Sequence, residues 1–179
     1  MSNFFKDTDI DTSQAEAIVT ETLKNCDDGE LYLENHKSES IVLDDNKIKS
    51  STYNSDQGYG FRAVTGEVVA YSHSNDISKE SLRKSSENLK DTLKSKKGTY
   101  NHEIPKTNNK YYENINPIES KTFDSKIDLL NSVNNYLRSK GSIVNQVTAN
   151  FLGEHKSIEI IRSDTVSYTH LRAHETEQH

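Results

Sequence analysis

The sequence predicts an α+β fold, in which an antiparallel or mixed β-sheet has helices packed on one face. The hydrophobic period changes from helical to alternating near Gly29 and returns to helical near Asp76. After a polar connection and another helical segment, a second alternating segment follows. This order of elements is typical of a sheet covered by helices, and 179 residues suffice for one ordinary domain.

The first helix is predicted over residues 14–26. Its start carries Ser13 and Glu16 at the spacing of a capping box. Apolar or small side chains then recur on one face, at Ala15, Ile18, Val19, Thr22, Leu23 and Cys26. Cys26 closes this stripe, and a buried, inert thiol is a better interpretation of it than a nucleophile.

Residues 31–71 are predicted to form a meander of antiparallel strands. Leu31 and Leu33 alternate with polar residues, and a hairpin turn is expected at residues 44–47. Further along, Tyr59, Phe61 and Ala63 alternate before a turn at residues 65–66 and a return strand.

Two more helices are predicted, over residues 79–93 and 122–138. The first has Asp76 or Ser78 as its N-cap and an apolar stripe at Leu82, Leu89 and Leu93. The second is expected to bury Phe123, Ile127, Leu130 and Leu137 and to stop at Gly141. Residues 98–116 between them are polar and aperiodic, which predicts a long surface connection.

A final strand pair is predicted beyond the third helix. Val147, Ala149 and Phe151 alternate, a turn is expected at residues 153–156, and Ile158 and Ile160 follow it.

The charge balance excludes several classes of partner. A formal net charge of −6 and the lack of a basic tract disfavour binding to nucleic acid and to anionic membranes. The single cysteine permits no internal disulfide, and no apolar run has the length of a signal peptide or a membrane span. We therefore expect a protein of the reducing cytoplasm.

Several short patterns suggest sites, and a structural interpretation is better for each. Gly58 and Gly60 do not form a phosphate loop, because a hairpin and not a helix follows them. Three oxygen-bearing residues, Asp44, Asp45 and Asn46, lack the spacing of a calcium loop and predict a plain turn.

Two histidine–carboxylate pairs remain, His73 with Asp76 and His102 with Glu103. Both lie in polar stretches without an arrangement for a nucleophile, so catalysis is not assigned to them. The adjacent Tyr111 and Tyr112 are either a partner-contact patch or anchors of a loop.

The segments LYLE (31–34), GYGFRAV (58–64) and QVTANFLGEHKSIEIIRSD (146–164) together resemble the amino-terminal domain of the TldD/PmbA family of metalloproteases. The similarity runs from about residue 13 to residue 163, and residues 71–78 are more similar to the TldD subunit than to its PmbA (TldE) partner. The chain is accordingly divided into a polar leader (1–12), this domain (13–164) and a tail (165–179).

The resemblance implies a full protein that is a zinc-dependent peptidase, cleaving unstructured peptides as a heterodimer with a PmbA-like subunit. The family's metal motif, His-Glu-x-x-x-His, belongs to its carboxy-terminal domain, so no catalytic, cofactor-binding or metal residue is assigned in this sequence. The alternative function is a non-catalytic binding or assembly module, either the PmbA/TldE-like partner or a stand-alone domain. A His-Glu-x-x-x-His motif further along the parent gene would distinguish the two.

The last six residues also read His-Glu-x-x-x-His, with His174, Glu175 and His179. Helical spacing would place the two histidines about 140° from a common face. A catalytic zinc also needs about three protein ligands, and no third one follows. Residues 166–176 resemble the translation of an adapter used in transposase-based sequencing. We therefore interpret the tail as adapter-derived, expect it to be loosely docked or extended, and assign no metal site to it.

Removing residues 166–179 is predicted to leave the melting temperature nearly unchanged, because such a tail was never selected to pack. Zinc titration of the full chain should show only the weak binding of scattered histidines. Tight one-to-one binding that a His174→Ala, His179→Ala variant loses, with a zinc-dependent rise in melting temperature, would contradict the adapter interpretation.

Overall fold

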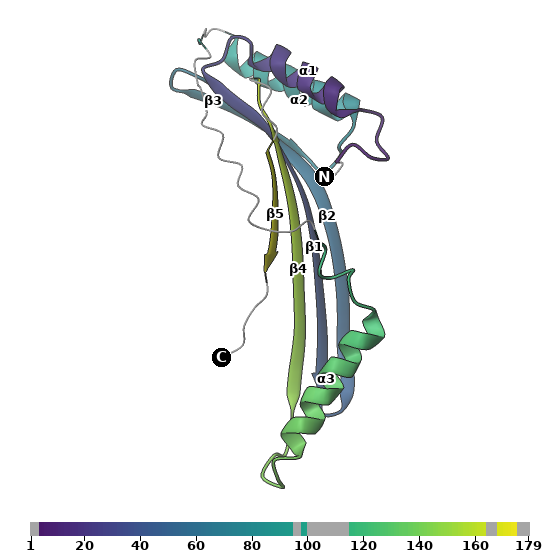
Figure 1. The fold of residues 1–179 in the computed structure, drawn as a ribbon. Helices are drawn as coiled ribbons and strands as arrows, with labels where there is room; N and C mark the ends of the chain where they lie inside the picture. Colours follow the sequence, from purple (N-terminus) through teal and green to yellow (C-terminus); the bar gives the residue numbers. More distant parts are fainter. Residues whose placement is uncertain (1–3, 95–97, 100–114, 164–167, 175–179) are drawn as a thin grey trace. The chain divides into compact units, whose positions relative to one another are not determined.

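The computed structural model describes residues 4–94, 98–99, 115–163 and 168–174, and it confirms the predicted fold class (Figure 1). Helices and an antiparallel sheet alternate along the chain in the expected order. The elements are α1 (Thr12–Leu23), β1 (Asp28–Asp44), β2 (Lys47–Thr65), β3 (Val68–Ser74), α2 (Lys79–Leu93), α3 (Phe123–Arg138), β4 (Thr148–Ile161) and β5 (Tyr168–His174).

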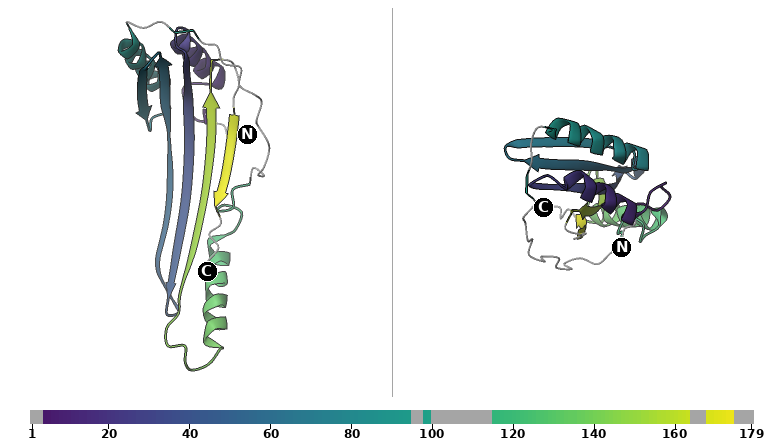
Figure 2. Two further views of the ribbon diagram at one scale, coloured as in Figure 1. Left: turned by 90° about the vertical axis from the view of Figure 1, so that its left-hand side faces the viewer. Right: turned by 90° about the horizontal axis from the view of Figure 1, so that it is seen from above.

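The strands are ordered β3-β2-β1-β4-β5 across the sheet, as Figure 2 shows. A two-residue turn joins β1 to β2, and both of its residues, Asp45 and Asn46, have positive φ. This is the pattern of a type I′ turn, whose twist matches that of the strands it connects. β2 pairs antiparallel with β3 over residues 59–65, with Arg62 opposite Tyr71. The predicted meander is confirmed, with long uninterrupted strands.

Contacts divide the chain into two compact units, and β1, β2 and β4 contribute a segment to each. The first unit takes its residues from 1–35, 56–112 and 157–170, and the second takes them from 36–55, 113–156 and 171–179.

In the first unit, α1 and α2 lie next to each other and bury their apolar stripes with the odd-numbered residues of β1 and β2 (Figure 1). The fully buried side chains include Val19, Leu23, Leu31, Leu33, Phe61, Leu82 and Leu89. α2 spans the predicted residues 79–93, and Ser78 is its N-cap, since the Ser78 hydroxyl accepts the Ser81 N–H.

The predicted limits of α1 are wrong by two to three residues. Its N-cap is Asp11, whose carboxylate accepts the Gln14 N–H at 2.8 Å, while the Gln14 side chain accepts the Asp11 N–H. This pair forms the capping box in place of Ser13 and Glu16 because Asp is also a strong N-cap. At the other end, the Cys26 N–H donates to the Leu23 carbonyl three residues back, a tight turn that ends the helix at Leu23.

In the second unit, α3 packs on the odd-numbered face of β1 and β4. Its core consists of Ile41, Leu43, Leu130 and Ala149, with Phe151 packed against them. The predicted limits of α3 are confirmed to within one residue, and Thr122 is its N-cap.

The face of α3 predicted to be buried is only partly right. Leu130 is buried and Ile127 is partly buried, but Phe123 and Leu137 are exposed. The buried row consists of Lys126, Leu130 and Asn134, four residues apart. Lys126 and Asn134 can be buried because each has a hydrogen-bond partner. The Asn134 side-chain amide donates to the Asn46 side chain at 2.5 Å.

The predicted turn at residues 153–156 is also wrong, because β4 runs through it without interruption. Its buried residues remain odd-numbered to the end, so that Ile161 is buried and Ile158 and Ile160 are only partly buried. Gly153 signals close packing and not a turn: a Cβ there would lie 3.3 Å from the Ile118 side chain.

A buried ion pair joins α3 to β1 in the second unit. The Lys126 ammonium donates to the Glu39 carboxylate and, at 2.6 Å, to the Ile118 carbonyl, and it lies 5.6 Å from the centre of the Phe151 ring. Both side chains are less than a tenth exposed. Each charge thus depends on the other for its compensation.

His155 is a second buried polar group on the same face, contributed by β4. It is 8% exposed, and its Nε2 has no hydrogen-bond partner among the described residues. Burial lowers the pKa of the ring, the positive charge of Lys37 lowers it further, and Glu119 opposes this shift. Lys37 and Glu119 form an ion pair at 2.5 Å. The folded chain therefore favours the neutral imidazole.

Replacing Lys126 with Met is predicted to cost roughly 3–5 kcal/mol of unfolding free energy, because it leaves the Glu39 carboxylate buried without a cation. The double variant Lys126→Met, Glu39→Met should recover most of this loss. Urea denaturation of the single and double variants measures both. A double variant as unstable as Lys126→Met, or a single variant of nearly normal stability, would contradict the coupling.

The free energy of unfolding is predicted to fall as the pH drops below about 6.5, the ordinary pKa of histidine. Between that value and the lower pKa of folded His155, the unfolded chain binds more protons than the folded chain. Asp27, Asp28, Asp44 and Glu119 also have lowered pKa values, and they add a loss only near and below about pH 4.

The variant His155→Gln should therefore show a smaller change of melting temperature with pH between about pH 7 and pH 5 than the unmodified chain does. The matched control is His73→Gln, because His73 is exposed. If the melting temperatures of both variants depend on pH as that of the unmodified chain does, His155 is not the origin of this pH dependence.

Candidate functional site

A hollow of about 410 Å³ lies on the sheet of the second unit. Its lining includes even-numbered residues of β1 and β4, whose side chains point away from the face that α3 covers. Its walls come from three strands, with Ser38, Glu39 and Ser40 of β1, Thr52 and Asn54 of β2, and Leu152, Gly153 and Glu154 of β4.

The hollow offers hydrogen-bonding groups as well as apolar surface. Hydroxyl groups come from Ser38, Ser40 and Thr52, an amide from Asn54, and Leu152 adds an apolar side chain. Glu39 also lines it, although its carboxylate is already bonded to Lys126. The hydroxyl and amide groups can form hydrogen bonds with a peptide backbone, and Glu154 adds a carboxylate.

One wall of the hollow is also a sheet edge. β3 pairs with β2 over residues 59–65, so among the described strands residues 47–55 of β2 have β1 on one side and no strand on the other. Thr52 and Asn54 lie within this segment. A free edge presents backbone N–H and C=O groups to which an extended chain can bind.

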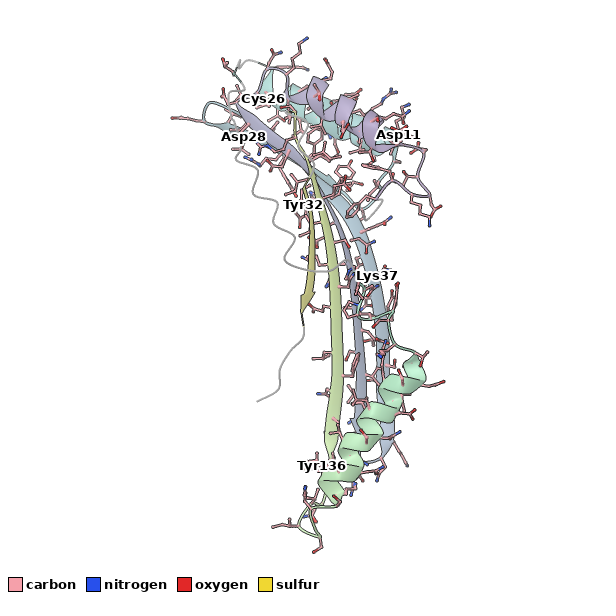
Figure 3. All side chains as sticks on the ribbon, viewed as in Figure 1. Asp11, Cys26, Asp28, Tyr32, Lys37 and Tyr136 are labelled. Carbon is pink, nitrogen blue, oxygen red and sulfur yellow. The ribbon has the colours of Figure 1, made fainter. Side chains whose placement is uncertain are left out.

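The first unit has a compact charged cluster instead. Arg62 donates to Asp28 at 2.5 Å and to Glu30 at 2.6 Å, and Arg162 donates to Asp28 at 2.7 Å. Asp28 is labelled in Figure 3. Burial alone would raise the pKa of Asp28, but the bonds from the two arginines outweigh it and lower that pKa. Since two cations compensate two carboxylates, this cluster fixes strands and leaves neither carboxylate as a base.

The residues singled out in the β1–β2 turn bond within the protein. The Asp44 carboxylate accepts from Gln146 and Thr148, each at 2.9 Å, and these bonds lower its pKa. Asp45 pairs with Arg138, and Asn46 accepts from Asn134. The predicted turn is confirmed.

Gly58 and Gly60 lie in β2, as the strand interpretation predicts. A Cβ on Gly60 would lie 2.5 Å from the Tyr71 hydroxyl, and one on Gly58 would lie 2.8 Å from the Ser74 carbonyl. Glycine is therefore required at position 58, where the neighbour is backbone, whereas at position 60 the neighbour is the end of the exposed Tyr71 side chain, which can move.

The structure gives no support to a pair between His73 and Asp76. The His73 ring stacks on Tyr71, whereas the Asp76 carboxylate accepts from the Ser78 hydroxyl at 2.8 Å. Cys26 is buried, and burial raises the pKa of its thiol, which favours the inert interpretation.

Other predicted features lie outside the described residues, namely His102, Glu103, Tyr111, Tyr112 and, in the tail, Glu175 and His179. His174 is the last residue of β5, which is extended. Within the described residues, no three His, Cys, Asp or Glu side chains are placed to hold a metal ion, and no helix is long and apolar enough to cross a membrane.

Sequence reasoning missed the hollow and the buried ion pair. Glu39 is two residues before Ile41 in an alternating strand, a position that signals burial, and Lys126 is four residues before Leu130. These two signals together could have suggested the pair. No comparable signal exists for the hollow, because its residues come from three distant segments.

Comparison with known proteins identifies the family. Residues 29–94 match the family model of PmbA/TldA metallopeptidase domain 1. The metalloprotease TldD homolog of Buchnera aphidicola subsp. Acyrthosiphon pisum is 34% identical over 142 residues, which are 79% of this chain and 29% of that protein. The homolog of Haemophilus influenzae is 32% identical over 147 residues, with 79% and 30% covered.

Solved structures share the fold at low sequence identity. A Thermotoga maritima protein with a proposed role as a modulator of a DNA gyrase has a TM-score of 0.67 at 14% identity, over 81% of this chain and 33% of that one. TldE from Thermococcus kodakarensis has a TM-score of 0.60 at 13% identity, over 88% and 36%.

This chain spans about three tenths of the length of the curated relatives it matches. The residues that match the family model include the β1–β2–β3 meander and α2, and the similarity to TldD homologs extends over most of the chain. The protein therefore belongs to the TldD/PmbA family, of which it carries the amino-terminal domain.

Proposed function

We propose that this chain is the amino-terminal part of a TldD-like zinc metalloprotease subunit that acts on unstructured peptides. The observation that carries the proposal is the 34% identity to a metalloprotease TldD homolog along 79% of the chain. In this proposal the chain itself is not the hydrolytic centre.

The residues present do not fit the metal ion that the family name implies. A catalytic zinc needs about three protein ligands, and the described residues offer no group of three His, Cys, Asp or Glu side chains in position. We therefore assign no step of hydrolysis to these residues.

The contribution we propose for this chain is to bind the peptide. In the second unit, an extended peptide can add to the free edge of β2 while the hydroxyl and amide groups of the hollow bond to it. Backbone hydrogen bonds depend little on sequence, which suits unstructured substrates.

The working assembly we propose is a heterodimer with a PmbA/TldE-like subunit in the cytoplasm. The similarity of the fold to TldE from Thermococcus kodakarensis supports a partner built from the same kind of domain. The lone, buried cysteine suits a reducing compartment.

The second candidate is a non-catalytic binding or assembly module. The lack of a metal-ligand group among the described residues and the presence of a binding hollow favour it for the chain taken alone. A His-Glu-x-x-x-His motif with a later ligand further along the parent gene would favour the protease, and its absence would favour the module.

The full chain is predicted to bind a labelled, unfolded peptide mixture without cleaving it, with or without added zinc. The variant Ser40→Tyr, which fills the hollow, should weaken binding by at least about tenfold, because the larger side chain excludes the peptide. Fluorescence anisotropy measures binding, and mass spectrometry detects cleavage.

The matched control is Ser142→Tyr, the same substitution at an exposed serine outside the hollow. Equal binding by the two variants would overturn the assignment of the hollow. Zinc-dependent cleavage that persists through repeated purification would overturn the view that this chain lacks the hydrolytic centre.

A further inference from the structure

The hollow of the second unit carries one carboxylate that the protein does not compensate. Of the described residues that line the hollow, two are ionisable, Glu39 and Glu154. The Glu39 carboxylate is buried and bonded to the Lys126 ammonium. Glu154 is exposed, and no described residue forms an ion pair or a hydrogen bond with its carboxylate. The hollow therefore presents one negative charge to a ligand.

The Glu154 side chain lies on the same face of the sheet as the serine hydroxyl groups of the hollow. The Asp44 carboxylate accepts from the Thr148 hydroxyl, which places the even-numbered residues of β1 and β4 on one face. Burial alternates without a break from these residues to Ser38 and Glu154, so both side chains keep that face. It is the face that α3 leaves uncovered.

Leu152 supplies apolar surface beside this carboxylate. It precedes Glu154 by two residues in β4, so that both side chains point to the same face, and it is 52% exposed. A lysine or arginine side chain has the matching two parts, an apolar stem and a cationic head. The stem can lie on Leu152 while the head reaches Glu154, and the Ser38 hydroxyl can accept a further hydrogen bond from the head.

The cations of the neighbouring strand positions have partners elsewhere. Lys156 follows Glu154 on the same side of β4, but it does not line the hollow and it has an interaction of its own. Lys37 pairs with Glu119 at 2.5 Å and belongs to the odd-numbered face of β1. The described residues that line the hollow include no cation, so a cation from a ligand can take that place.

We propose that the hollow selects extended peptides that carry a lysine or arginine side chain, and that Glu154 determines this preference. The inference rests on the proposed peptide-binding role of the hollow and adds which substrates that site favours. Backbone hydrogen bonds at the edge of β2 still bind any sequence. Because Glu154 remains in contact with water, the preference is modest, about two- to fivefold in dissociation constant.

Three synthetic peptides test the preference. They share one uncharged, unstructured sequence and differ only in a central lysine, glutamine or glutamate. Fluorescence anisotropy measures their binding to the full chain. We expect the lysine peptide to bind most tightly and the glutamate peptide most weakly. The difference between the lysine and glutamine peptides should shrink at about 0.5 M salt, because salt screens an exposed charge.

Variants of Glu154 test its role. Glu154→Gln should bind the lysine and glutamine peptides equally, with its affinity for the glutamine peptide unchanged to within about twofold. Glu154→Lys should reverse the preference and bind the glutamate peptide most tightly. The matched controls Glu67→Gln and Glu67→Lys make the same changes of net charge at an exposed glutamate of the first unit, and they should keep the preference for lysine. Circular dichroism confirms that each variant is folded.

Each contrary outcome has a distinct meaning. Equal binding of the three peptides by the unmodified chain would overturn the preference and leave the peptide-binding role in place. A preference lost equally in Glu154→Gln and Glu67→Gln would belong to the net charge of the chain and would overturn the role of Glu154. A chain that binds none of the three peptides would overturn the peptide-binding role and the preference with it.

Discussion

The alternation of buried residues along the long strands is the constraint on which the rest of the structure depends. Odd-numbered residues of β1 are buried in both units, Leu31 and Leu33 in the first and Ile41 and Leu43 in the second. A register slip of one residue would turn all of them to the other face. The same alternation directs Ser40 and its even-numbered neighbours into the hollow, so packing and binding surface are specified together.

The polar residues on the covered face then determine how α3 lies in the second unit. Glu39 occupies a position that alternation buries, and it requires a cation. Lys126 supplies that cation and so selects the row that also contains Leu130 and Asn134. A helix bound by an ion pair cannot rotate to bury more apolar surface, because rotation would leave Glu39 uncompensated. The exposure of Leu129, Val133 and Tyr136 on α3 is a consequence of this choice.

Much of the fold could be predicted from the sequence, because hydrophobic period and caps are local signals. α2 has the predicted limits, and the meander has its predicted turn at Asp45 and Asn46. The errors arose where a distant partner decides the outcome: Glu39 stabilises the buried Lys126, and Ile118 fills the space beside Gly153. Of the candidate site, the sequence provided only the family, since the hollow combines residues from three strands.

The two candidate functions make the same demand on this domain. A subunit that hydrolyses unstructured peptides and a module that only binds them both need recognition that does not depend on particular side chains. A free strand edge beside hydroxyl and amide groups provides such recognition through backbone hydrogen bonds. The chemistry that separates a protease from a binding module requires additional ligands for a metal. The distinction therefore belongs to the part of the relatives that this chain does not span, whereas peptide binding is the contribution that we propose for this domain in either case.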